Sequence, residues 1–241
     1  MSAAPVFLIG FAAAGKTSVG RALAASLGRR FVDLDDVIAA RAGQPVPALV
    51  AADEPGFRRL EADALAELAA ADDAPVIATG GGAAVHGDNL ARMKAAGVVL
   101  ALDVPLAVAL ARAAPTPATR PLLARPAAEV EALYRRRAPV YRRAHATLAT
   151  AGATVAEVAA AAHAAALRVG ATAARHPWVT LGERSYPIVV DDTPLVALLA
   201  PHVRPGRHAL VADRNLAPWV EPTVAALTAH GAQVHVAWLA P

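Results

Sequence analysis

The sequence has no cysteine among its 241 residues and only two lysines, Lys16 and Lys94. The absence of cysteine excludes disulfide bonds, thiolate catalysis and cysteine-bound metals, and it favours a reducing, cytoplasmic location. No uncharged apolar stretch reaches the roughly 18 residues of a membrane span, and no basic region precedes the short apolar run near the N-terminus. We therefore expect neither a membrane partner nor a signal peptide.

The charge pattern does not favour a nucleic-acid partner. The pI near 9.8 is basic, but the formal net charge is only +3. The densest arginine cluster, residues 135–143, alternates with apolar residues as one face of a helix would. The eight histidines are scattered and show no metal-ligand spacing.

A phosphate-binding loop follows the apolar run at residues 6–9. Residues 10–17 fit the pattern G-x-x-x-x-G-K-[ST], in which backbone N–H groups and the next helix hold nucleotide phosphates. The pattern predicts an ATP site made of Gly10, Ala12, Ala13, Ala14, Gly15, Lys16, Thr17 and Ser18. Lys16 would reach the β- and γ-phosphates, and the Thr17 hydroxyl would reach Mg²⁺. The alternative is a glycine-bearing turn that binds nothing.

Apolar runs and helical patterns then alternate along residues 1–168. Continuous apolar runs predict strands over residues 31–36, 75–79, 98–103 and 146–150, as in parallel sheets that are covered on both faces. We expect an α/β fold with a doubly wound parallel sheet. Four prolines between residues 113 and 126 predict a mobile lid carrying Arg120 and Arg125, followed by a helix over residues 127–137 that Pro139 ends. A helix over residues 155–168 closes the domain.

Candidate site residues follow the predicted strands, where ligands bind in such sheets. Asp33 and Asp35 would point to the same side of an extended chain, one toward Mg²⁺ and the other toward a hydroxyl acceptor. Gly80, Gly81 and Gly82 allow close backbone approach to a ligand. The alternatives are surface aspartates, a plain turn and, for Arg58, a solvated arginine beside Glu61. No guanine-binding Asn-Lys-x-Asp motif is present.

Residues 3 to about 168 resemble shikimate kinase, a P-loop kinase. The resemblance rests on the phosphate loop and on six further motifs, which are residues 31–35, 56–59, 78–82, 102–106, 119–123 and 137–141. It implies phosphorylation of the 3-hydroxyl of shikimate by ATP with Mg²⁺, a step of aromatic amino-acid biosynthesis. Ala13 departs from the family, which usually has glycine there.

The resemblance also implies a role for each matching residue. Thr17 and Asp33 would hold Mg²⁺, and Asp35 would contact the shikimate hydroxyl. Arg58 and Arg137 would bind the shikimate carboxylate, with Gly80 to Gly82 as backbone ligands. The lid residue Arg120 would contact the γ-phosphate, and Arg112 would stack on adenine. The catalytic set is then Lys16, Asp35 and Arg120.

Residues 169–177 read as a linker, and residues 178–241 as a second, partial α/β segment. A hairpin is expected around residues 182–185, followed by one β-α-β unit over residues 208–239. Residues 178–188 and 211–218 resemble the start of 3-dehydroquinate synthase, where Asp213 and Asn215 could face NAD. That family's glycine-rich loop and metal ligands are absent from this sequence. NAD and a divalent metal would bind only in a complete synthase domain, so the segment is expected to be inactive and to belong to a fused kinase-synthase.

The sequence thus predicts an ATP-dependent shikimate kinase. Two alternatives stay open from the residues alone. One is another small-acceptor P-loop kinase such as a gluconate kinase, and the other is a nucleotide-binding module without activity.

Overall fold

A computed structural model describes residues 4–114, 121–173, 178–179, 186–187, 195, 199 and 205–239. The chain divides into two compact units, Met1–Val189 and Val190–Pro241. Arg120, which is predicted to lie in a lid, is outside the described residues, and so are residues 174–177 of the predicted linker.

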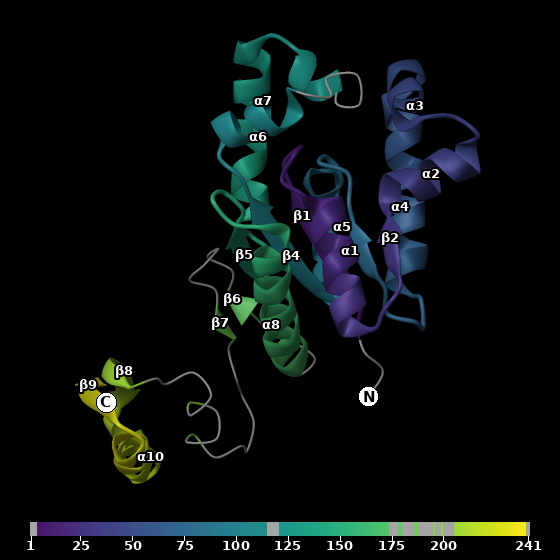
Figure 1. The fold of residues 1–241 in the computed structure, drawn as a ribbon. Helices are drawn as coiled ribbons and strands as arrows, with labels where there is room; N and C mark the ends of the chain where they lie inside the picture. Colours follow the sequence, from purple (N-terminus) through teal and green to yellow (C-terminus); the bar gives the residue numbers. More distant parts are fainter. Residues whose placement is uncertain are drawn as a thin grey trace. The chain divides into compact units, whose positions relative to one another are not determined.

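The first unit is built on five parallel strands in the order β2-β3-β1-β4-β5 (Figure 1). These are β1 (Val6–Gly10), β2 (Phe31–Asp33), β3 (Val76–Ala78), β4 (Val98–Asp103) and β5 (Ala146–Ala149). β1 is central, with Phe7 opposite Ile77 on one side and Val99 on the other. All five residues of β1 are buried, as expected for a parallel strand between two helical layers. The predicted doubly wound parallel sheet is confirmed.

Helices cover both faces of this sheet. They are α1 (Lys16–Leu27), α2 (Leu34–Ala42), α3 (Val46–Ala52), α4 (Glu54–Ala69), α5 (Asn89–Ala96), α6 (Leu106–Ala113), α7 (Ala127–Tyr141) and α8 (Val155–Ala173), with 3₁₀ turns η1 (Ala83–Val85) and η3 (Pro121–Ala124). α1 and α8 pack against each other (Figure 1). The connections β1-α1-β2 and β3-α5-β4 run in opposite directions along the sheet. Right-handed crossovers then place α1 and α5 on opposite faces.

The second strand is shorter than predicted. β2 ends at Asp33, and α2 begins at Leu34, so Asp33 and Asp35 do not share an extended chain. Asp33 is the N-cap of α2, and its carboxylate accepts a hydrogen bond from the Asp35 N–H. Aspartate is a favoured N-cap because its side chain satisfies a free N–H of the first turn. Asp35 therefore projects from the first turn of a helix.

Two helices are longer than predicted. α7 passes through Pro139 to Tyr141, because the proline lies in the last turn and Arg142 N still donates to the Ala138 carbonyl at 3.2 Å. Arg137 and Tyr141, four residues apart, are both buried on one side of that helix. α8 runs past Arg168 because Val169, which is fully buried, continues its apolar stripe. Residues 169–173 are therefore helical.

The predicted hairpin and β-α-β unit are both confirmed. β6 (Trp178–Val179) pairs antiparallel with β7 (Tyr186–Pro187). In the second unit, β8 (Gly206–Asp213) and β9 (Ala232–Leu239) pair in parallel and are joined by η6 (Arg214–Leu216) and α10 (Ala217–Ala229). Val220 and Leu227 of α10 are buried, as are Ala212 and Ala232 of the strands.

Among the helices of the described residues, none has both the length and the apolar character needed to cross a membrane.

Candidate active site

The phosphate loop links the central strand β1 to α1, as predicted. Gly10 has φ +143°, and a Cβ built on it would lie 2.5 Å from the Leu102 carbonyl oxygen. Only glycine fits this position. Gly15, the N-cap of α1, has φ +93°, and no side chain caps the helix. The N–H groups of the first turn of α1 therefore have no side-chain acceptor and can receive an anion.

Lys16 holds its ammonium group inside this loop. Its Nζ donates to the carbonyl oxygens of Gly10 at 3.0 Å and Phe11 at 2.9 Å. The charge therefore lies within the curve of the loop, where phosphates bind in this motif.

Thr17 and Asp33 meet at the start of α1. The Thr17 hydroxyl donates to Asp33 Oδ2 at 2.9 Å. A hydroxyl and a carboxylate are oxygen ligands of the kind that Mg²⁺ prefers. The described residues contain no cluster of three or more His, Asp and Glu side chains that could hold a metal alone. A Mg²⁺ ion here would complete its coordination with nucleotide phosphates and water, which is its usual mode of binding.

Asp35 presents a buried oxygen that has no hydrogen-bond partner among the described residues, Oδ1. Burial raises the pKa of Asp35, the Asp33 carboxylate raises it further, and Lys16 opposes both effects. A buried acceptor without a donor is costly. The first turn of α2 thus holds a carboxylate that a ligand hydroxyl would satisfy.

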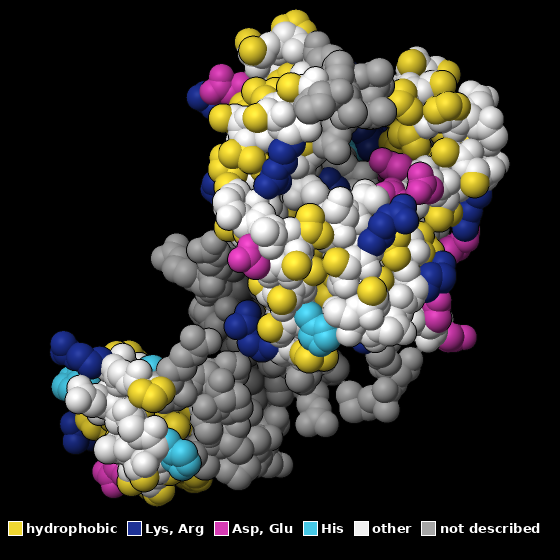
Figure 2. All heavy atoms as spheres, in the orientation of Figure 1, with side chains coloured by type: hydrophobic (Ala, Val, Ile, Leu, Met, Phe, Trp, Pro, Cys, Tyr) yellow, Lys and Arg dark blue, Asp and Glu magenta, His cyan; other side chains and the backbone are white. Residues whose placement is uncertain are grey.

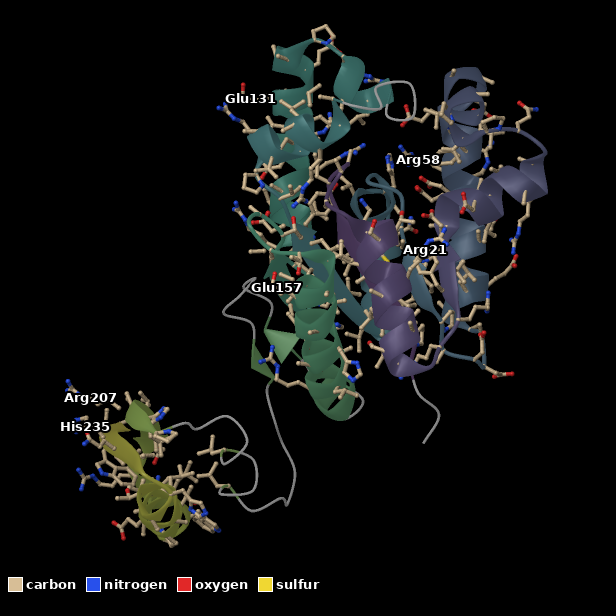
Figure 3. All side chains as sticks on the ribbon, in the orientation of Figure 1. Arg21, Arg58, Glu131, Glu157, Arg207 and His235 are labelled. Carbon is tan, nitrogen blue, oxygen red and sulfur yellow. The ribbon has the colours of Figure 1, made fainter. Side chains whose placement is uncertain are left out.

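Arg58 reaches from α4 toward the loop that follows β3 (Figure 3). Its side chain is only 17% exposed, so the alternative of a solvated arginine is wrong. Nη1 donates to Glu61 at 2.9 Å and Nη2 donates to Glu54 at 3.0 Å. Glu61 is 1% exposed, and burial raises its pKa against the opposing charge of Arg58. Two carboxylates therefore fix the guanidinium in place.

Arg137 approaches the same loop from α7. It is 9% exposed, and burial lowers its pKa. The Tyr141 hydroxyl is hydrogen-bonded to Arg137 and donates to the Gly81 carbonyl oxygen at 2.5 Å. Burial raises the pKa of Tyr141 to about 12, so the phenol stays protonated at neutral pH.

The three glycines after β3 bring these groups together. A Cβ on Gly80 would lie 2.8 Å from Asp35 Oδ1 and 3.2 Å from Glu61 Oε1. On Gly81 it would lie 3.5 Å from Arg137 Nη1, and on Gly82 it would lie 2.8 Å from Arg58 Nη1. None of the three has a positive φ. The need for glycine is therefore steric at Gly80 and Gly82, where a Cβ would crowd the side chains of Asp35 and Arg58, whereas at Gly81 the contact would be an ordinary one.

Two carboxylates and two guanidinium groups thus surround Gly80 to Gly82. Gly81 also lies close to the phosphate loop, since its added Cβ would be 3.7 Å from Ala12 N and from Gly10 O. Figure 2 shows acidic and basic side chains gathered where the surface is hollowed between the α6–α7 side and the α2–α4 side of this unit. The arrangement suits a small anionic acceptor beside a nucleotide phosphate.

The family profile described as shikimate kinase matches residues 12–166. The chain belongs to the shikimate kinase family. Over 154 residues it is 42% identical to the shikimate kinase of Salinibacter ruber, a match that covers 59% of this chain and 75% of that protein. Over 146 residues it is 46% identical to the shikimate kinase of Nitratidesulfovibrio vulgaris, covering 58% and 82%.

Solved shikimate kinases share the fold. The structure of the Acinetobacter baumannii enzyme in complex with shikimate matches with a TM-score of 0.63 at 35% identity, covering 67% of this chain and 91% of that one. The Aquifex aeolicus enzyme matches with a TM-score of 0.61 at 32% identity, covering 70% and 99%. The predicted resemblance of the first domain to shikimate kinase is confirmed. Residues 178–241, which are predicted to resemble a synthase, lie beyond the matched residues.

The structure brings together most of the predicted site residues. Lys16, Thr17, Asp33 and Asp35 form one group, and Arg58, Arg137 and the three glycines form the other. Ser18 is exposed on α1. Arg112, expected to stack on adenine, donates to the phosphate loop and to Thr150.

Sequence reasoning missed Glu61, Tyr141 and Thr150 as supports of this site. Spacing offers a signal for two of them, since Glu61 follows Arg58 by three residues and Tyr141 follows Arg137 by four, which places each pair on one helix face. For Thr150, residue spacing gives no such signal.

Proposed function

We propose that this chain transfers the γ-phosphoryl group of ATP to the 3-hydroxyl of shikimate and forms shikimate 3-phosphate, a step of aromatic amino-acid biosynthesis. The observation that carries the proposal is the buried Oδ1 of Asp35, which has no hydrogen-bond partner among the described residues, beside the partly buried guanidinium of Arg58, the buried guanidinium of Arg137 and a phosphate loop. Shikimate would offer a hydroxyl donor to Asp35 and a carboxylate to the two guanidinium groups.

Binding of the acceptor would follow from charge and shape. Arg58 and Arg137 each present a planar guanidinium that can hold a carboxylate through two parallel hydrogen bonds. Glu61 and Tyr141 fix the directions of these two groups. The N–H groups of Gly80 to Gly82 lie close enough to contact the same ligand because no Cβ intervenes.

The nucleotide would be held by the loop and by Lys16. Thr17 and Asp33 would hold Mg²⁺, which neutralises charge on the phosphates when it is bound. Lys16 would exchange the carbonyl oxygens of Gly10 and Phe11 for phosphate oxygens. Arg120, which lies outside the described residues, would add charge at the γ-phosphate.

Asp35 would orient the acceptor hydroxyl and accept its proton during transfer. Burial raises the pKa of Asp35, which makes its carboxylate a better proton acceptor, and the nearby Lys16 charge opposes this rise. Phosphoryl transfer needs little covalent help from the protein, so positioning and charge neutralisation carry the reaction.

Two variants test these roles. Lys16→Ala should abolish turnover without unfolding the domain, because the side chain serves phosphates and does not belong to the core. Asp35→Asn should lower kcat by about 10²-fold or more, the usual scale for a positioned acid or base, while ATP binding survives. Near wild-type turnover in Lys16→Ala would remove the phosphate-loop assignment. An equal loss of ATP affinity in Asp35→Asn would instead place Asp35 at the metal.

For the C-terminal part, we propose that residues 178–241 are an incomplete 3-dehydroquinate synthase-like segment, preceded by a kinase domain that extends to the end of α8 at Ala173 rather than to residue 168. The hairpin β6–β7 and the parallel pair β8–β9 support this proposal. Asp213 ends β8 and accepts a hydrogen bond from Asn215 N at 2.8 Å. NAD, a divalent metal and the rest of a fused synthase would be the partners of a complete domain.

A cytoplasmic location is part of the same proposal and is supported by the absence of cysteine.

A further inference from the structure

Ala13 in the phosphate loop adopts a conformation that alanine seldom takes. Its φ is +60°, in the left-handed region, where the Cβ of a non-glycine residue meets the backbone. Such a conformation persists only where surrounding contacts enforce it. The chain must therefore hold Ala13 in place through its neighbours.

One such contact comes from Arg112 of α6. Arg112 Nη1 donates to the Ala13 carbonyl oxygen at 3.4 Å and to Thr150 Oγ1 at 3.1 Å, and Nη2 donates to the Thr150 carbonyl oxygen at 2.5 Å. The two shorter bonds both go to Thr150. Thr150 is thus the anchor of the guanidinium, and Ala13 is what the guanidinium holds.

Thr150 is itself fixed to the sheet. It is 2% exposed, and both its N–H and its hydroxyl donate to the carbonyl oxygen of Asp103, the last residue of β4, at 2.9 and 3.0 Å. The Thr150 hydroxyl therefore donates one hydrogen bond to the strand and accepts another from Arg112, so it acts as both donor and acceptor. A chain of hydrogen bonds runs from the end of β4 through Thr150 and Arg112 to the phosphate loop.

We infer that Thr150, acting through Arg112, is a positioning residue that holds Ala13 in its left-handed conformation and keeps the phosphate loop shaped for the nucleotide. This inference rests on the proposed ATP-dependent activity. It also explains how the loop keeps its shape with alanine at position 13, because the hydrogen bond from Arg112 to the Ala13 carbonyl opposes the tendency of alanine to leave the left-handed region.

The test compares Thr150→Val with Thr150→Ser and a matched control. Thr150→Val keeps the shape but removes the hydroxyl, so KM for ATP should rise about 2- to 10-fold, the effect of one hydrogen bond on an equilibrium. KM for shikimate should change less than twofold. Thr150→Ser keeps the hydroxyl and should restore KM for ATP. Thr147→Val, in β5, the strand that Thr150 directly follows, removes a buried hydroxyl that has no hydrogen-bond partner among the described residues, and it should leave both constants unchanged.

Glycine at position 13 separates positioning from general destabilisation. In an Ala13→Gly background the left-handed conformation needs no support. In this background, the ratio of KM for ATP with Thr150→Val to KM for ATP without it should fall toward one. A merely structural role would lower thermal stability and raise KM for ATP equally in both backgrounds, and this result would overturn the inference. Thr150→Ala removes the same hydroxyl if the valine methyl group prevents folding.

Direct titration of ATP keeps this test independent of the acceptor. If the wild-type chain binds ATP but does not phosphorylate shikimate, the proposed function fails, while the ATP affinities of the same variants still decide the role of Thr150. An unchanged ATP affinity in Thr150→Val and Thr150→Ala would overturn the inference even if shikimate turnover is normal.

Discussion

Replacing Gly82 by alanine should weaken shikimate binding by moving Arg58. The backbone of Gly82 has φ −96° and ψ −22°, which alanine adopts without strain. The added Cβ would lie 2.8 and 2.9 Å from the two terminal nitrogens of Arg58 and 3.1 Å from Cζ. Ordinary van der Waals contact begins near 3.4 Å, so the guanidinium must retreat by about 0.6 Å.

That displacement determines the expected magnitude. Arg58 is the end of a flexible side chain, so Gly82→Ala should change the free energy of unfolding by less than about 1 kcal/mol. Losing a hydrogen bond to a charged group entirely costs roughly 1.5 to 3 kcal/mol, or about 10- to 150-fold in affinity. A partial loss puts the rise in KM for shikimate near 10-fold. KM for ATP should stay within twofold, because Arg58 does not belong to the phosphate loop.

Steady-state rates over a range of shikimate concentrations at saturating ATP measure this effect. Gly81→Ala is the contrast, because its Cβ would lie no closer than 3.5 Å to Arg137, an ordinary contact. It should raise KM for shikimate much less than Gly82→Ala does. Equal values of KM for shikimate in Gly82→Ala and the wild type would refute the placement of Arg58 in the acceptor site.

Three further predictions concern the acceptor arginines, acid stability and the C-terminal segment. Arg58→Lys and Arg137→Lys should each raise KM for shikimate about 10- to 150-fold with far less effect on KM for ATP, because an ammonium cannot copy the two parallel hydrogen bonds of a guanidinium; an unchanged KM for shikimate in both would exclude a carboxylate clamp. Burial, assisted by the nearby Lys94 charge, lowers the pKa of His145 from 6.5 to about 4. The contribution of neutral His145 to the free energy of unfolding is therefore complete above pH 6.5 and is lost as the pH falls toward 4, by up to about 3 kcal/mol. Denaturant unfolding at several pH values should show this slope in the wild type and a flatter one in His145→Gln. A chain ending at Ala173 should retain kinase activity, and the full chain should show no turnover of the synthase substrate with NAD and a divalent metal; loss of kinase activity on truncation would show that the tail is required.

The phosphate loop and the sheet could be predicted because their signals are local. Gly10 and Gly15 need positive φ values, and apolar runs such as residues 98–103 specify buried parallel strands without reference to the rest of the chain. The predicted ends of elements were less accurate. Asp33 is both the last residue of β2 and the N-cap of α2. The alternation of apolar and acidic residues over 31–36 could not show where the strand ends and the helix begins.

The supports of the site depend on contacts between distant parts of the chain. The Tyr141 hydroxyl contacts the carbonyl of Gly81, 60 residues away, and Arg112 contacts Ala13 across 99 residues. Such pairs arise from packing of helices onto the sheet and leave no periodic trace in the sequence. The role of Gly82 was only partly predicted. Its lack of a side chain was expected to leave space for a ligand, but it also leaves space for the Arg58 guanidinium.

The most direct test of the central claim is the initial rate of ADP release by the wild-type chain with ATP and Mg²⁺. The rate should be measured with shikimate, with gluconate and without an acceptor, and the product should be identified by mass spectrometry and phosphorus NMR. We expect ADP release only with shikimate, in a one-to-one ratio with shikimate 3-phosphate. Equal ADP release without an acceptor, or faster release with gluconate, would contradict the assignment.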